Sequence, residues 1–178
     1  MKFRKTPLAT VTLRYGLIAG VLAALLLVAI YYIGKHPMMV SPYLDYRILL
    51  FGVFIFFALK EVRDYHQNGA LYFWQGMVGS YVITFIASTL GALGLILFAS
   101  IEPQFISSYI DQRMHEWESF TQDEIELIGK QVYDSNILQL STTNSMQLAI
   151  TYFGQGIMIG LFISIILSVI LRKQPKPL

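Results

Sequence analysis

The sequence predicts an all-α integral membrane protein: a four-helix bundle with an extracytoplasmic pair of short amphipathic helices between its third and fourth spans. Two observations predict this class. Of the 178 residues, 55% are hydrophobic and only 13% are charged, whereas charged residues make up about a quarter of an ordinary soluble domain. The charges are also clustered, and four long stretches are nearly free of them, as expected of a chain whose solvent is a lipid bilayer.

The composition also excludes several other classes. An aromatic content of 14% argues against a disordered tail. The chain has no cysteine, so disulfides and thiolate metal sites are excluded. The net charge is only +2, and the basic residues lie beside apolar stretches instead of forming an aromatic-rich patch. Lipid headgroups are therefore the expected partner of these residues, and nucleic acid is not.

The first two spans follow from the charge-free runs near the N-terminus, since a helix needs about 20 residues to cross hydrocarbon. The first span is expected at about residues 15–34. No small-residue cleavage site follows it, which favours an uncleaved anchor over a signal peptide. The second span is expected at about 44–60. Its charge-free run covers only residues 48–59, so it must include Asp45 and Arg47 at its outer end.

The last two spans follow from longer runs. The charge-free run before the third span exceeds what one perpendicular helix needs, so the span is expected at about 75–101. Residues 71–74 then lie along the interface as an aromatic belt. The fourth span is expected at about 146–171, where a basic tail stops it. The whole chain, 1–178, is therefore interpreted as one membrane domain.

The basic residues predict the orientation. Nine of the 13 Lys and Arg residues fall in the N-terminal segment, the loop after the second span and the C-terminal tail. Positive charge stays in the cytoplasm, so both termini are placed there. The segment 102–145 then lies outside, where it holds eight acidic and two basic residues.

The segment 102–145 is the only stretch with soluble character, and it is expected to form two helices. In the first, apolar residues recur at helical spacing over 105–117. The second opens at Thr121 and Glu124, which fit a capping box, and has an apolar stripe over 125–132. Helices this short are unstable alone in water, so they are expected on the membrane face, on the span ends or on a partner.

Small residues at helical spacing in three spans predict close helix packing. The packing residues are Gly16, Gly20 and Ala24 in the first span, Ser80, Thr84, Ser88 and Gly91 in the third, and Gly156, Gly160, Ser164 and Ser168 in the fourth. In lipid, such stripes let backbones approach and provide van der Waals contact. Packing within one chain is the simpler interpretation, and a spare groove for a partner helix is the alternative.

No arrangement typical of catalysis is found, so neither enzymatic activity nor a cofactor is expected. Spans one, three and four contain no ionisable group that can act as acid or base with a nucleophile. Asp45 and Arg47 are the only intramembrane candidates. Because they are two residues apart, we expect them on different helix faces. An outer-interface pair that bonds to headgroups and water is favoured over a proton relay.

Two metal hypotheses are weaker than their alternatives. Asp111, His115 and Glu118 fall along one helical face, but a solvated acidic face is far more common than a metal site there. Met38 and Met39 are adjacent thioethers, and interface packing explains them better than copper binding. No metal is therefore predicted.

The loop after the second span has a strong turn signal in Asn68, which is followed by glycine. A tight cytoplasmic turn is the favoured interpretation. If this loop holds a site, it consists of Arg63, Asp64, Asn68 and Gln75. Arg63 and Asp64 then either pair with each other or bind a lipid phosphate.

Several short motifs in a fixed order follow the second and third spans. They are Lys60, Arg63, Asp64, Tyr65, Asn68, Gly69, Phe73, Gln75, Gly76 and Gly79, then IEPQF at 101–105 and TQDEIE at 121–126. Over about residues 10–173 the chain resembles a family of small, uncharacterised four-span bacterial membrane proteins, a domain of unknown function. The resemblance implies the same architecture and the bacterial inner (plasma) membrane. It implies no activity or catalytic residue. The charge-poor link 138–144 departs from the family pattern.

The expected function is that of a non-enzymatic membrane protein, an accessory or structural component of a membrane assembly or small oligomer. Its partners are then the lipid bilayer and other membrane subunits or further copies of itself. The alternative is a small transporter or channel for a neutral or lipid-like solute, with a path lined by Gln155, Ser164, Thr84 and Ser88. A continuous polar cavity favours the transporter, and a dry, tightly packed interior argues against it.

Overall fold

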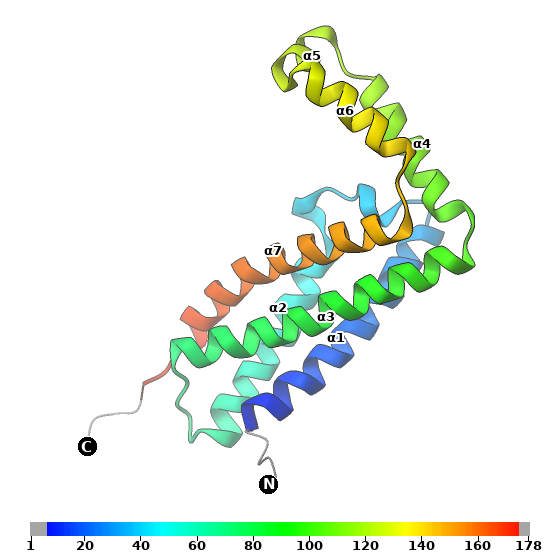
Figure 1. Cartoon of the computed structure of the whole chain (residues 1–178). Coiled ribbons are helices and arrows are strands. Elements are labelled where there is room, and N and C mark those ends of the chain that lie inside the picture. Colours follow the sequence, from blue (N-terminus) through cyan, green and yellow to red (C-terminus); the bar gives the residue numbers. More distant parts are fainter. Residues whose placement is uncertain (1–6, 175–178) are drawn as a thin grey trace, which may run out of the picture.

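The computed structural model describes residues 7–174, and these are almost entirely helical (Figure 1). The long helices are α1 (Pro7–Tyr32), α2 (Tyr46–Glu61), α3 (Phe73–Ile101) and α7 (Ser145–Leu171), with α4 (Gln104–Glu118), α5 (Gln122–Ile128) and α6 (Lys130–Ser141) between the last two. Two 3₁₀ turns, Pro37–Met39 and Pro42–Leu44, precede α2, and a π-helical segment η3, Val62–His66, follows it. Within the described residues there is no strand, only an isolated bridge.

Three of the helices, α1, α3 and α7, are long and apolar enough to cross a membrane. Each has a stretch of 18 residues with a mean hydropathy of 2.3. These helices indicate a membrane protein. Helix α2 has 16 residues and is too short to count among them by itself.

Helix α3 is the central element of the bundle. It packs against α1 on one side and α7 on the other, and α2 packs against both α1 and α7 (Figure 1). Its buried face is made mostly of small residues with Ile83 and Leu95 between them. On α2, Phe51 and Ile55 are fully buried in the same interior. The small side chains on this face let the neighbouring helices approach α3 closely, and the face is buried as a result.

The segment between α3 and α7 contains three helices, so the expectation of two is wrong. The capping box is present, because Thr121 Oγ1 accepts from the Glu124 amide at 3.4 Å and Glu124 accepts from the Thr121 amide at 2.7 Å. The helix that it opens, however, ends at Gly129. That glycine has φ +92°, a left-handed conformation that interrupts an α-helix. The chain starts a new helix, α6, which extends into the link expected at 138–144.

Of the stretch 71–74, expected as an aromatic belt, Leu71 departs from the prediction, whereas the aromatic residues Tyr72, Phe73 and Trp74 are exposed. Leu71 is fully buried, and its N–H and C=O groups bond to Lys173 at 2.8 and 2.9 Å. Phe73 already belongs to α3. The chain can turn inward here because Asn68 and Gly69 both adopt positive φ, which is the turn predicted from their sequence.

Candidate functional site

The site with the most unusual chemistry lies at the start of α2. Asp45 is the N-cap of this helix, with extended backbone, and its carboxylate accepts from the Arg47 amide at 2.9 Å. The same carboxylate accepts from Arg47 Nε at 2.9 Å and from Nη2. The expectation that these residues lie on different helix faces is therefore wrong. Asp45 precedes the helix, so the spacing rule for helical residues does not apply to it.

Arg47 is buried in the bundle and not placed among headgroups and water, so that expectation is also wrong. Only 3% of its side chain is exposed. Nη1 donates to the backbone oxygen of Tyr152 at 2.7 Å, and Nη2 donates to Gln155 Oε1 at 2.9 Å. The guanidinium lies 4.1 Å from the centre of the Tyr152 ring. A charged group that leaves water needs hydrogen-bond partners to offset its lost hydration. The Arg47 guanidinium has such partners in Asp45, Tyr152 and Gln155.

A hydrogen bond joins this cluster to α1, and close packing joins it to α3. The hydroxyls of Tyr46 and Tyr152 are 2.6 Å apart, and the Tyr46 hydroxyl also donates to the Ala23 backbone oxygen at 3.2 Å. A Cβ atom added at Gly91 would lie 2.7 Å from Tyr152 Cε1, so only glycine leaves room for this ring. The five residues Asp45, Tyr46, Arg47, Tyr152 and Gln155, the Arg47 network, therefore connect all four long helices.

The chemistry of the Arg47 network is that of a closed ion pair. The guanidinium is bonded to the Asp45 carboxylate and to two acceptors on α7, which makes it a poor proton donor or acceptor. No group of three His, Cys, Asp or Glu side chains able to hold a metal occurs in residues 7–174. We interpret the network as a polar clamp that fixes the start of α2 to α7.

The small residues of α3 and α7 face each other. A Cβ at Gly156 would overlap Ser88 Oγ, and a Cβ at Gly160 would overlap Thr84 Cγ2. At the far end of the same interface, a Cβ at Gly76 would lie 2.8 Å from Ser168 Oγ. Glycine on one helix thus makes room for a hydroxyl side chain on the other, which explains the close approach of the two backbones.

The hydroxyls in this interface differ in how they are satisfied. Ser80 and Thr84 donate to the backbone oxygens four residues earlier, at 2.7 and 2.9 Å. The buried hydroxyls of Ser88, Ser164 and Ser168 have no hydrogen-bond partner within the part of the chain that the structure describes.

The small residues of α1 lie against the opposite side of α3. A Cβ at Gly16 would lie 3.0 Å from Ile86 Cβ, and a Cβ at Gly20 would lie 2.7 Å from Leu90 Cβ. Ala24 occupies the space beside Gly94, where an added Cβ would be 2.6 Å from the alanine methyl. The structure therefore places the small-residue stripes of all three spans in contacts within one chain.

The four residues proposed for a cytoplasmic loop site have separate local roles. Arg63 and Asp64 form an ion pair at 2.7 Å, and the Arg63 guanidinium holds the pKa of Asp64 below its usual value. Asn68 forms the turn, and Gln75 accepts from the Tyr72 amide at 3.2 Å, which caps α3. Within residues 7–174, no hydrogen bond joins Asn68 or Gln75 to that ion pair.

The sequence reasoning missed Glu61, at the end of α2. It accepts from Arg14 Nη2 at 2.6 Å and from the Tyr15 hydroxyl at 3.0 Å. A signal for this contact was available, because Arg14 directly precedes the first expected span and Glu61 directly follows the second. In an antiparallel helix pair these two positions meet.

It also missed His36, which is buried between α1 and α4. Its Nδ1 accepts from the Met38 amide at 3.2 Å, so Nε2 carries the proton and donates to the Phe105 oxygen at 3.1 Å. Burial, with a smaller contribution from Arg113, lowers its pKa to about 4, and the bond to the Phe105 oxygen only partly opposes this. Met38 is buried in the same cluster, which favours the packing interpretation of that methionine.

These features define an all-helical protein with three helices able to cross a membrane and a buried ion pair that clamps a fourth, shorter helix to them. The chain belongs to a family described as "Protein of unknown function (DUF4199)", whose model matches residues 14–173. The resemblance to an uncharacterised family that the motif order indicated is thereby confirmed. No curated protein and no solved structure matches the chain.

Proposed function

We propose that this protein is a non-enzymatic, four-span component of a membrane assembly, with α2 as the fourth span. Helix α2 has 16 residues, which is about 24 Å at 1.5 Å per residue. A span shorter than the hydrocarbon core is accommodated by local thinning of the bilayer and by snorkelling of flanking residues such as Lys60. The Arg47 network supports this assignment, because it seats the start of α2 among the three long apolar helices.

The proposed membrane is the inner membrane of a bacterium, with both termini in the cytoplasm. Two contacts support a common side for the three basic segments. The Arg14–Glu61 ion pair brings the start of α1 to the end of α2, and the bridge between Leu71 and Lys173 brings the second loop to the tail. Both described ends of the chain lie at one end of the bundle, and α4–α6 lie at the other (Figure 1).

The observation that carries the proposed role is the projection of α4–α6 beyond the bundle (Figure 1). Their acidic residues from Asp111 to Asp134 are all exposed. Such a surface has the shape and charge of a contact site for a basic partner surface, either on another subunit or on a second copy.

Partner binding is tested by purification in mild detergent, chemical cross-linking and native mass measurement. We expect a companion protein or a second copy with the native chain. A triple variant, Glu118→Lys, Asp123→Lys and Glu126→Lys, should lose it, because three exposed acids become basic. The matched control, Gln112→Lys, adds one charge to an exposed position outside this group. A strictly monomeric native chain contradicts the proposal.

Orientation is tested with single cysteines, since the natural chain has none. A membrane-impermeant maleimide added to intact cells should label Gln112→Cys in α4 and should label Gln67→Cys only after the cells are opened. The opposite pattern, or labelling of both positions in intact cells, contradicts the proposed topology.

The second candidate function is a transporter for a neutral or lipid-like solute. The three unpartnered seryl hydroxyls between α3 and α7 favour it, whereas the overlap of a Cβ at Gly160 with Thr84 argues for a closed interface. A Ser164→Cys variant separates the two functions. A dry interface leaves this thiol unlabelled by a water-soluble maleimide, and rapid labelling supports a polar path.

A further inference from the structure

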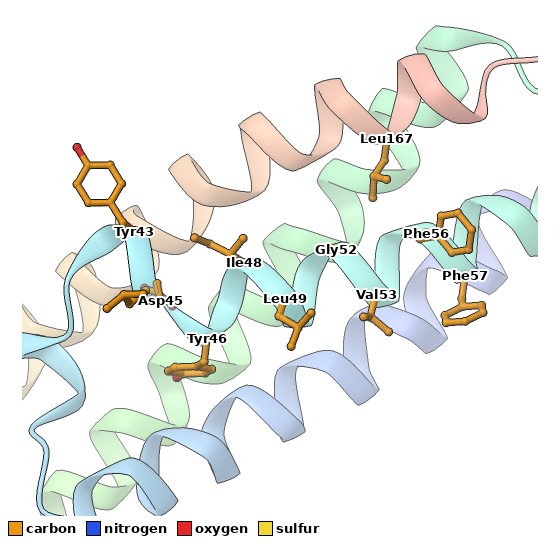
Figure 2. A pocket seen from close by; sticks show the side chains of 11 residues that line it. Tyr43, Asp45, Tyr46, Ile48, Leu49, Gly52, Val53, Phe56, Phe57 and Leu167 are labelled. Carbon is orange, nitrogen blue, oxygen red and sulfur yellow. The ribbon is translucent and has the colours of Figure 1, made fainter.

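Two hollows on the protein differ in their chemistry. The groove along α2, of about 730 Å³, is lined mainly by apolar side chains such as Leu49 and Val53, and its Asp45 is already bonded to Arg47 (Figure 2). The other hollow, of about 490 Å³, lies where α4 and α6 meet the start of α7, and most of its side chains are polar. We call it the insert pocket. Its volume is typical of a small-molecule site.

Three helices form the walls of the insert pocket. On α4, Tyr109, Arg113 and Trp117 recur at every fourth position, so they lie on one side of that helix. The other walls come from α6, the charge-poor link after it and the first turns of α7. Their lining residues are Asn136, Gln139, Leu140, Thr143, Gln147, Leu148 and Thr151.

Several polar groups of the insert pocket are not used by the fold. Within residues 7–174, the side chains of Asn136, Gln139 and Thr151 have no hydrogen-bond partner, and neither has the indole N–H of Trp117. Gln147 accepts from the N-cap amide of α7 at 3.1 Å through its side-chain oxygen, which leaves its amide N–H groups free to donate. The pocket therefore offers a ligand more donors than acceptors.

The insert pocket also differs in charge from the segment around it. Residues 102–145 hold eight acidic and two basic residues, yet no acidic residue of this segment lines the pocket, whereas the basic Arg113 does. Arg113 Nη1 donates to Glu116 at 2.7 Å, and Nε and Nη2 have no acceptor within residues 7–174. An anion can accept from this free side of the guanidinium.

These groups indicate the chemical class of the ligand. A guanidinium with further N–H donors suits a phosphate group, which has more acceptor oxygens than a carboxylate. Amide and threonine side chains both donate and accept, as hydroxyl groups do, so Asn136, Gln139 and Thr151 suit a hydroxylated group. The rings of Tyr109 and Trp117 provide apolar surface for its C–H groups.

The insert pocket lies at the end of a helix that is longer than the hydrocarbon core. Helix α7 has 27 residues and is about 40 Å long at 1.5 Å per residue, against about 30 Å for the core. When α7 crosses a membrane, its first turn with Gln147 reaches the headgroup layer, and α4 and α6 project beyond it (Figure 1). Dissolved molecules and lipid headgroups both have access to such a position.

We propose that the insert pocket binds a phosphate ester of a small polyol, with the phosphate at Arg113 and the hydroxyl groups at Asn136 and Gln139. The same chemistry is found in a free polyol phosphate and in the headgroup of phosphatidylglycerol. The inference goes beyond the proposed function, because the pocket includes no residue of α2 and no acidic residue of the proposed contact surface.

The two tryptophans of the chain provide the measurement. Trp117 lines the insert pocket, whereas Trp74 lies in the first turn of α3, far from α4. The full-length variant Trp74→Phe is placed in vesicles of phosphatidylcholine, and glycerol 3-phosphate is added. Trp117 fluorescence should change and saturate, with weaker binding of inorganic phosphate. Trp117→Phe, which retains Trp74, is the matched control and should show no change.

A second set of vesicles distinguishes the two sources of the ligand. If the ligand is a lipid headgroup, replacing phosphatidylcholine by phosphatidylglycerol should change Trp117 fluorescence, and the soluble ester should add little. If the ligand is a free molecule, the response to glycerol 3-phosphate should be the same in both vesicles. Either result supports the inference.

Three variants test the binding groups. Arg113→Gln should weaken binding by about tenfold or more, because a charge-assisted hydrogen bond is lost. Lys130→Gln removes the same charge from the other basic residue of 102–145, outside the pocket, and should leave binding unchanged. The double variant Asn136→Leu, Gln139→Leu should bind inorganic phosphate as before and lose the preference for the ester.

Three results overturn the inference. The first is the absence of a Trp117 response to both the soluble ester and phosphatidylglycerol. The second is an equal loss in Arg113→Gln and Lys130→Gln, since binding then depends on net charge alone. The third is an unchanged preference for the ester in the double variant, a result that decides even if Arg113→Gln does not fold.

Discussion

The two ends of helix α2 each carry an arginine–carboxylate ion pair, but in opposite surroundings. At the start, Arg47 and Asp45 have side chains only 3% and 9% exposed. At the end, Arg14 and Glu61 are 57% and 23% exposed, although their closest atoms are 2.6 Å apart. The distances between the charged atoms do not distinguish the two ion pairs, whereas the exposed fractions of their side chains do.

This difference in burial indicates which of the two ion pairs contributes more to the stability of the fold. A buried pair has no water to replace a missing partner, so each group depends on the other and on the hydrogen bonds around them. An exposed pair is hydrated and screened, and contributes about 0 to 1 kcal/mol. We therefore expect the start of α2 to be fixed by chemistry and its end to be held mainly by packing.

The largest expected effect comes from removal of the buried cation. Arg47→Ala leaves the Asp45 carboxylate without its partner in the bundle, which should destabilise the protein by about 3 to 5 kcal/mol. Thermal or denaturant unfolding in mild detergent, followed by tryptophan fluorescence, measures this. A loss below 1 kcal/mol would mean that the two ends of α2 are equivalent.

The double variant Asp45→Asn, Arg47→Met is the control for that measurement. It removes both charges, so no charged group is left without a partner. The double variant should therefore be more stable than either single variant, Asp45→Asn or Arg47→Met. If the losses of the single variants simply add, the two residues do not act as a pair.

A change in pH should test a further buried group, which lies outside α2. His36, buried between α1 and α4, has a pKa of about 4 in the folded protein against an ordinary value of 6.5. The unfolded chain therefore binds the proton first, and the stability due to neutral His36 is complete above pH 6.5 and lost as the pH falls toward 4. We expect a loss on the order of 3 kcal/mol, measured as the difference between the native chain and His36→Gln. Equal acid sensitivity of both proteins contradicts this.

A smaller effect is expected from the tyrosine hydroxyls of the Arg47 network. Tyr152→Phe keeps the ring over Arg47 and removes the hydroxyl that bonds to Tyr46. A loss of about 1 kcal/mol is expected in the same unfolding measurement. Tyr81→Phe, on α3 and outside the network, is the matched control and should change little.

The smallest effect is expected at the other end of α2. Glu61→Gln removes the charge that Arg14 contacts and retains a hydrogen-bond acceptor, so the loss should stay within about 1 kcal/mol and shrink with added salt. Unfolding at low and high ionic strength measures it. A loss as large as that for Arg47→Ala would reverse the comparison.

The helices themselves were largely predictable from the sequence. Long charge-free runs have only one stable form in lipid, and α1, α3 and α7 all lie within or overlap the runs expected to be spans. The capping box at Thr121 and the turn at Asn68 were also predictable, since both depend on neighbouring residues alone. The third helix of the insert was not, because a single glycine within a helical pattern does not show from the sequence alone whether it interrupts the helix.

The candidate site was predictable in composition but not in arrangement. Asp45 and Arg47 stood out as charges beside an apolar run, yet their burial depends on Tyr152 and Gln155, more than 100 positions later. No local pattern links such positions. His36 gave no signal for the same reason, because its acceptor, Phe105, belongs to a distant segment.

The interface between α3 and α7 has a consequence for biogenesis. Helix α7 leaves the ribosome after α3, so the hydroxyl-bearing face of α3 stays uncovered until translation has passed residue 168. A nascent protein interrupted in the insert would display Ser80, Thr84 and Ser88 to acyl chains with no glycine helix to cover them. Exposure of these three hydroxyl side chains therefore distinguishes an incomplete chain from the finished bundle. Membrane quality control has this exposure as a feature to recognise.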